Sequence, residues 1–248
     1  TIALDGAANS TVRNVSTSQS LTVNAAATST TLLFKDVAGT ADAYAINFNA
    51  DNTTNTNAGT VVIDGIETVT VNSVGKTGVA NTITLTDDAA KSLVITGDKA
   101  LTVNFATTFG STTPADATNG LGVSTIDASA ATGAVAINTT NVKVAFNGLT
   151  VKTGSANDAI TLAQKATVDA GAGDDTITVS ASGGTLTGGA GKDAFIVSAA
   201  VATGTTEATS VLTTITSVDA GDTIKLAVVA ATDAFNKTAI NISAATNL

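Results

Sequence analysis

Three short turns rich in glycine and aspartate carry the residues best suited to chemistry in this chain. The clearest, residues 188–196, reads Gly-Gly-Ala-Gly-Lys-Asp-Ala-Phe-Ile and fits every position of the nonapeptide Gly-Gly-x-Gly-x-Asp-x-apolar-x. The second, residues 170–178, departs from that pattern only at its first glycine. The third, residues 153–161, keeps the second glycine, the aspartate and the apolar residue. Because carboxylate and main-chain carbonyl oxygens are the ligands that Ca²⁺ prefers, these turns predict calcium binding.

The candidate metal-binding residues are glycines that shape each turn and aspartates that supply a charged oxygen. Glycine is needed where φ is positive, or where a side chain would prevent the carbonyl oxygens from pointing inward. The apolar residue after the aspartate enters the core and fixes the turn. Since Ca²⁺ takes about six to eight oxygens, we expect two successive turns to complete one site. The predicted site residues are Asp158, Gly171, Gly173, Asp175, Gly189, Gly191 and Asp193, with Gly154, Asp169, Asp174 and Gly188 as further candidates.

The strands around these turns recur at a nearly fixed interval. The apolar strand centres Ile160, Val168, Ile177, Leu186 and Phe195 follow one another at steps of 8, 9, 9 and 9 residues. Such a step is typical of a solenoid, in which each strand and turn buries its apolar side against its neighbours. The motif aspartates lie 17 and 18 residues apart, so we expect the three turns to stack on one edge, with at most about two ions between them.

Several acidic positions also have an ordinary structural explanation. Each turn alone resembles a common glycine/aspartate turn between strands, most of all residues 153–161, and Asp174 is expected to face solvent. Residues 218–226 echo the second motif without its Gly-x-Gly core, so we interpret them as a turn that caps the roll. Asp87 and Asp88 follow a strand pattern, and we interpret them as a solvated turn.

The elements that must position these turns are short strands. Stretches rich in β-branched residues are each broken by Gly, Asn, Asp or Ser, which predicts an all-β chain. Pro114 is the only proline and lies in a polar stretch, which predicts a loop or internal boundary at residues 114–120. We therefore expect a β-strand-rich region at 1–113, and a parallel β-roll or β-solenoid with calcium-binding turns and a C-terminal cap at 121–248. One elongated body and two domains both remain open.

Composition excludes several classes of function. The chain has 11 basic and 20 acidic residues and a net charge of −9, which disfavours nucleic acid as a partner. His and Cys are both absent, which excludes a Ser-His-Asp triad, a thiol nucleophile and a His-ligated zinc site, so we do not expect an enzyme. No apolar run approaches the length of a membrane span. An acidic surface suits a divalent cation and simple solubility equally well.

The nonapeptides of residues 153–196 resemble those of the RTX family of secreted bacterial repeat proteins. Within that family, the chain resembles the RTX-type surface-layer proteins. This narrower resemblance rests on less specific features: the segments at 62–71 and 124–130, and a composition rich in Thr, Ala and Asn. The resemblance implies type I secretion, folding outside the cell on meeting Ca²⁺, and assembly into an S-layer lattice on the bacterial cell surface. It also implies contact with cell-surface polysaccharide through regions outside this chain.

Two other functions remain open from the sequence. A secreted adhesin or binding module would present an exposed pocket or a ladder of threonines. The chain could also be the calcium β-roll portion of a larger secreted enzyme whose catalytic domain lies elsewhere. A catalytic domain upstream in the gene would favour the enzyme, and further Thr- and Ala-rich repeats would favour the lattice.

Overall fold

The structure is a computed structural model that describes residues 1–6, 8–110, 122–145, 148–179, 182–198, 213–227 and 240–242. The loop predicted at 114–120 lies outside these ranges, as does most of the segment after residue 227. Within them the chain is built from β-strands and one short 3-10 helix, η1 (Thr139–Asn141). The all-β prediction is confirmed.

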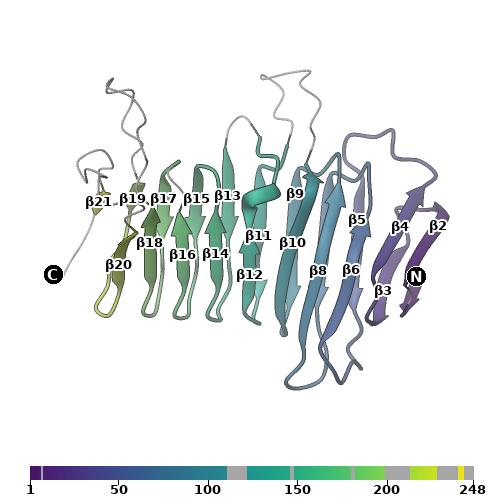
Figure 1. Ribbon diagram of the computed structural model, residues 1–248, viewed down its shortest axis with the longest axis horizontal. Coiled ribbons are helices and arrows are strands. Elements are labelled where there is room, and N and C mark those ends of the chain that lie inside the picture. Colours follow the sequence, from purple (N-terminus) through teal and green to yellow (C-terminus); the bar gives the residue numbers. More distant parts are fainter. Residues whose placement is uncertain are drawn as a thin grey trace.

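The strands alternate between two parallel sheets that run along the whole molecule (Figure 1). The first sheet contains, in order, β1 (Ile2–Asp5), β3 (Ser20–Ala25), β5 (Ala43–Phe48), β7 (Thr68–Ser73), β9 (Ser92–Gly97), β11 (Thr125–Ala131), β13 (Leu149–Lys152), β15 (Ala166–Asp169), β17 (Gly184–Thr187), β19 (Thr213–Ile215) and β21 (Ile240–Ile242). The second contains β2 (Asn9–Val15), β4 (Ser29–Phe34), β6 (Thr56–Val62), β8 (Ala80–Asp87), β10 (Ala100–Phe109), β12 (Val135–Asn138), β14 (Ala159–Leu162), β16 (Thr176–Val179), β18 (Ala194–Ser198) and β20 (Thr223–Ala227). Each coil of the chain thus contributes one strand to each sheet, which is the arrangement of a β-solenoid.

The predicted register is confirmed strand by strand. Ile160 pairs with Ile177, and Ile177 with Phe195, in the second sheet, while Val168 pairs with Leu186 in the first. We expected the roll only after residue 120, but the same two sheets already contain β1 to β10. Strand β9 pairs with β11 and β10 with β12, so both sheets continue across residues 111–121.

The coils differ in length along the solenoid. Between β3 and β9, side-chain hydrogen bonds that join adjacent coils span 25 residues from Asn24 to Asn49 and 24 residues from Asn72 to Thr96. Around β14 and β16, the equivalent bonds between adjacent coils at Asp158, Asp175 and Asp193 span 17 and 18 residues. Strands β13, β15 and β17 are also short, with four residues each. The motif turns therefore lie in the narrower half of the molecule.

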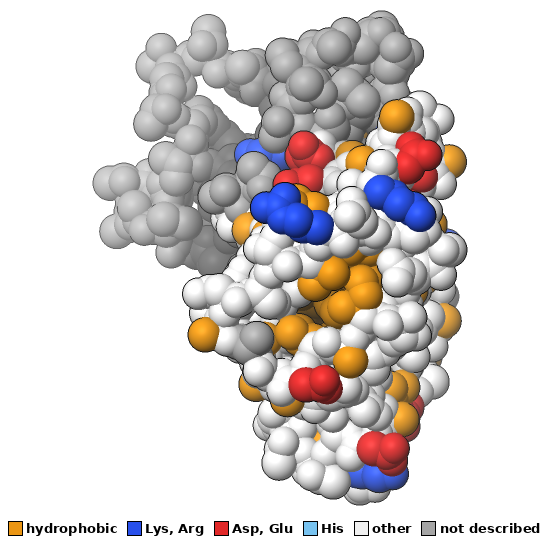
Figure 2. Space-filling model, turned by 90° about the vertical axis from the view of Figure 1, so that its right-hand side faces the viewer, with side chains coloured by type: hydrophobic (Ala, Val, Ile, Leu, Met, Phe, Trp, Pro, Cys, Tyr) orange, Lys and Arg blue, Asp and Glu red, His pale blue; other side chains and the backbone are white. Residues whose placement is uncertain are grey.

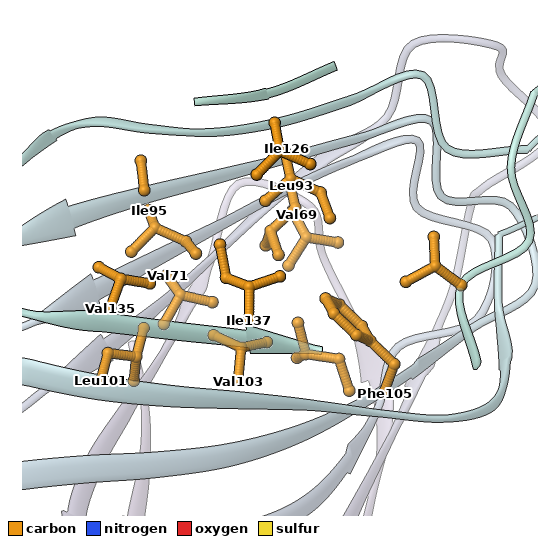
Figure 3. Close-up of a cluster of buried hydrophobic side chains, with 14 of the residues drawn as sticks. Val69, Val71, Leu93, Ile95, Leu101, Val103, Phe105, Ile126, Val135 and Ile137 are labelled. Carbon is orange, nitrogen blue, oxygen red and sulfur yellow. The ribbon is translucent and has the colours of Figure 1, made fainter. Parts of the chain in front are cut away.

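The core lies between the two sheets and forms one continuous cluster of apolar side chains from Leu4 to Val218. Side chains alternate along each strand, so Val69 and Val71 of β7 point inward, toward the side of the core lined by Leu101 and Val103 of β10 in the opposite sheet (Figure 3). Because each coil passes from one sheet to the other and back, the buried strands of this core also fix where the turns between them lie.

Candidate metal centre

The three motif turns all connect the first sheet to the second, and they stack along one edge of the solenoid. They are residues 153–158 before β14, 170–175 before β16 and 188–193 before β18, at the lower edge of Figure 1. Main-chain hydrogen bonds join them: Ala172 N donates to Gly154 O and Ala190 N to Gly171 O, both at 2.9 Å. The stacking expected from the spacing is therefore present.

The motif glycines are required because successive turns approach very closely. Gly189 and Gly191 have φ values of 106° and 138°, which L side chains rarely adopt. A Cβ at Gly189 would lie 1.9 Å from the carbonyl oxygen of Gly171, and one at Gly191 would lie 2.1 Å from that of Gly173. Gly171 and Gly173 make the same approach to the turn before them, at 2.2 and 2.5 Å. These positions exclude any side chain.

We expect Gly191→Ala to destabilise the protein by about 2 kcal/mol, because it adds a clash with a carbonyl oxygen to the strain of a positive φ. Gly78→Ala is the matched control: its φ is +81°, yet a Cβ there would meet nothing within 4 Å. Gly78→Ala should cost only about 1 kcal/mol, from φ alone. Urea unfolding of the two variants measures the difference, and equal losses would show that the turns do not pack this closely.

The aspartates of the three turns and one aspartate beyond them form a continuous hydrogen-bonded column, here called the aspartate ladder: Asp158, Asp175 and Asp193, followed by Asp222 just before β20. Asp158 N donates to Asp175 Oδ1 at 2.7 Å, and Asp175 N donates to Asp193 Oδ1 at 3.0 Å. Asp193 N donates to Asp222 Oδ1 at 2.8 Å, and Val135 N donates to Asp158 Oδ1 at 2.6 Å at the other end. Each carboxylate thus accepts a main-chain hydrogen bond from the preceding coil.

The two middle rungs of the ladder each carry a buried oxygen without a hydrogen-bond donor. Asp175 and Asp193 are both 1% exposed, and the Oδ2 atom of each has no partner. The end rungs differ, because Asp158 Oδ2 accepts from Gly154 N and Asp222 Oδ2 accepts from Asp219 N. A buried carboxylate oxygen without a donor is costly, and a bound cation would remove that cost.

Burial also disfavours the ionised form of these carboxyls. It raises the pKa of Asp175 to about 7, and the charges of Asp158, Asp193 and Asp174 act in the same direction. Burial likewise raises the pKa of Asp158 and of Asp193, although hydrogen bonds from the main chain partly oppose the rise. Once ionised, the ladder therefore concentrates negative charge that a bound cation would compensate, and carboxylate oxygens suit Ca²⁺.

Gly188 packs directly against one of the two unpartnered oxygens. A Cβ at this position would lie 2.1 Å from Asp193 Oδ2, so any side chain here would displace the carboxylate. Gly154 is needed for a different reason, because its Cβ would lie 1.9 Å from the carbonyl oxygen of Ala131 in the preceding coil.

Two of the predicted acidic candidates lie outside the ladder. Asp169 is exposed on β15. Asp174 is also exposed, and its Oδ1 accepts a hydrogen bond from Lys192 N at 2.8 Å, while its own N donates to Asn157 Oδ1. Asp174 therefore belongs to an outer column of polar contacts and not to the buried one.

The sequence reasoning missed Asp222 as a member of the ladder. Residues 218–226 were interpreted as a cap because they lack the Gly-x-Gly core, and the sequence separation of Asp193 and Asp222 is 29, which is no multiple of nine. The signal that would have found it is the triplet Asp222-Thr223-Ile224, which repeats the Asp-Thr-Ile of residues 175–177. In the structure Ile224 pairs with Phe195, which places Asp222 beside Asp193.

Comparison with known proteins adds no assignment to this geometry. No protein-family model matches the chain, and no curated protein matches it. Within the part of the chain that the structure describes, no helix is long and apolar enough to cross a membrane. The aspartate ladder itself therefore carries the case for a metal centre.

Proposed function

We propose that this chain is a structural calcium-binding protein of the bacterial surface-layer type. In this proposal it lies outside the cell, Ca²⁺ holds its coils together, and copies of it associate into a lattice. The observation that carries the calcium half is the pair of buried, unpartnered oxygens on Asp175 and Asp193, in turns that match the nonapeptide. Neither His nor Cys is available for catalysis, which supports a structural role over an enzymatic one.

Asp175 and Asp193 would hold Ca²⁺ through their Oδ2 atoms, and main-chain carbonyls of the same turns would supply neutral ligands. The bound ion would neutralise buried charge and link neighbouring coils. Because an unfolded chain offers no preformed set of oxygens, the free energy of binding adds directly to the free energy of folding. This supports a protein that folds where Ca²⁺ is plentiful, in agreement with the resemblance to secreted RTX proteins.

The end of the solenoid that carries β1 and β2 supports self-association. Among the described residues, no strand pairs with the outer edges of β1 and β2, and free edges of this kind favour pairing with another chain. Figure 2 looks onto this end, where apolar side chains line a hollow of about 240 Å³. Ile2, Leu4, Val12 and Leu21 are among its lining residues. We propose that a further strand covers this end, supplied by a second copy of the chain or by residues that precede Thr1 in a longer protein.

Sedimentation velocity tests the proposed self-association. With Ca²⁺ present, we expect larger species to appear as protein concentration rises, and chelation of Ca²⁺ to reduce them. Val12→Lys should suppress these species, because it places a charge in the hollow. Thr11→Lys is the control, since Thr11 is exposed on the same strand and does not line the hollow. A strict monomer at high concentration with Ca²⁺ would overturn self-association.

A further inference from the structure

A second cluster of acidic residues lies on the opposite edge of the solenoid. Asp64 belongs to the turn between β6 and β7, Asp87 is the last residue of β8, and Asp88 begins the turn to β9. Both turns run from the second sheet to the first, whereas the turns of the aspartate ladder run from the first to the second. The cluster is at the upper edge of Figure 1, in the wider half of the molecule.

The three carboxylates converge on one point. Each contributes an oxygen, and these oxygens lie within 4.8 Å of one another, in the only such group of three acidic residues among the described residues. Asp64 and Asp88 are exposed. Asp87 is 0% exposed, because its side chain points into the core from β8, as those of Ile83 and Leu85 do. The interpretation of this pair as a solvated turn is therefore wrong for Asp87.

The hydrogen bonds of the cluster leave one buried oxygen without a donor. Asp87 Oδ1 accepts from Ala89 N at 2.9 Å and from Ile66 N at 3.4 Å, and Asp88 Oδ1 accepts from Gly65 N at 3.0 Å. Asp87 Oδ2 has no partner. The main chain therefore fixes the orientation of these carboxylates and leaves Asp87 Oδ2 as a buried oxygen without a donor, which is costly unless it finds another partner.

The charged groups around Asp87 do not neutralise it. Burial raises the pKa of Asp87 to about 7, and the carboxylates of Asp64 and Asp88 act in the same direction. Lys91 is the cation of the same turn, but its Nζ lies 3.7 Å from Glu67 Oε1 and donates to Thr40 O. The positive charge near this turn is thus already paired with Glu67.

We propose that Asp64, Asp87 and Asp88 form a divalent-cation site suited to Ca²⁺, which joins the turn after β6 to the turn after β8. Two oxygens bound to one Ca²⁺ lie at most about 5 Å apart, because each is about 2.3–2.6 Å from the ion. The observed spacing, within 4.8 Å, falls inside that limit. The exposed Asp64 and Asp88 give the ion a path to the buried Asp87.

This site would extend cation-dependent stability to the part of the solenoid that lacks nonapeptides. It involves other residues, on the other edge, than the aspartate ladder, so it does not depend on the proposed function. Its occupation would fix two adjacent coils by their turns, as Asp175 and Asp193 would on the opposite edge.

Paramagnetic broadening by Mn²⁺ tests the site, since Mn²⁺ also prefers carboxylate ligands. In the folded chain we expect low concentrations of Mn²⁺ to broaden the amide signals of Gly65, Ile66 and Ala89, and an excess of Ca²⁺ to restore them. Asp87→Asn should abolish this broadening, because the amide keeps the acceptor oxygen and removes the charge. Asp51→Asn is the control, because Asp51 is an exposed carboxylate in a different turn, paired with Lys76.

Two outcomes would overturn the proposal: no broadening at these three amides, or broadening that persists in Asp87→Asn, which would indicate only loose binding at the exposed carboxylates. The amides of Gly171 and Gly189 report separately on the aspartate ladder, so either site can fail while the other stands. If the spectrum of Asp87→Asn indicates loss of folding, Asp64→Asn is the second variant, because it replaces an exposed member of the cluster. It should raise the Mn²⁺ concentration needed to broaden the amide signal of Ala89 at least tenfold.

Discussion

Asp175→Asn is expected to remove a large part of the calcium-dependent rise in thermal stability, and to raise the stability of the calcium-free protein at pH 8. Asn keeps an oxygen that can accept the hydrogen bond from Asp158 N, but it removes the buried charge whose Oδ2 lacks a donor. At a Ca²⁺ concentration 100 times Kd, one site contributes about 2.7 kcal/mol, or about 5–10 °C in Tm for a chain of this size. Tm measured by circular dichroism against Ca²⁺ concentration gives both results.

Two matched variants make this expectation specific. Asp174→Asn removes the same charge one residue away, but Asp174 is exposed, so its calcium response should remain close to that of the wild type. Asp158→Asn should have an intermediate effect, because both oxygens of Asp158 already accept main-chain hydrogen bonds. If Asp174→Asn abolishes the response while Asp175→Asn leaves it intact, the register of the turn is wrong by one residue.

The sequence predicted the narrow half of the solenoid well because its period is visible there. The short coils place strand centres at the nearly constant step seen from Ile160 to Phe195, and the glycine and aspartate turns mark one edge. Between β3 and β9 the coils are longer, as the pairs of Leu21 with Ile46 and Val71 with Ile95 show, and their turns share no motif. The same architecture therefore produced only a pattern of short strands, and the continuity of the two sheets could not be predicted.

The positions of the site residues were easier to predict than their hydrogen bonds. The nonapeptide marks Asp175 and Asp193, but it does not indicate which carboxylate oxygen lacks a donor, because that depends on how adjacent coils align. Asp87 was open to prediction: Ile83, Leu85 and Asp87 share one face of a strand, so alternation alone places this carboxyl inside. The interpretation of Asp87 and Asp88 as a solvated turn did not take this alternation into account.

The stability of the calcium-free protein is expected to fall as pH rises from about 4 to about 7. Burial raises the pKa of Asp175 and of Asp87 from 3.8 to about 7. Over this range the folded state holds protons that the unfolded state has released, so the stabilisation present below pH 4 is lost by the time both carboxyls ionise in the folded state. For each carboxyl the loss is at most about 4 kcal/mol. Urea unfolding in calcium-free buffer at pH 4, 5, 6, 7 and 8 measures it.

Calcium should reverse this dependence, because only the ionised carboxylates bind the ion and binding therefore releases protons. The difference in unfolding free energy with and without Ca²⁺ should be small at pH 5 and largest at pH 8. The double variant Asp87→Asn/Asp175→Asn is the control, and its calcium-free stability should change much less over the same range, since the two carboxyls whose pKa rises to about 7 are gone. A calcium-free wild type that becomes more stable between pH 5 and pH 8 would contradict the expectation, because its buried carboxyls would then be stabilised in their ionised form without any cation.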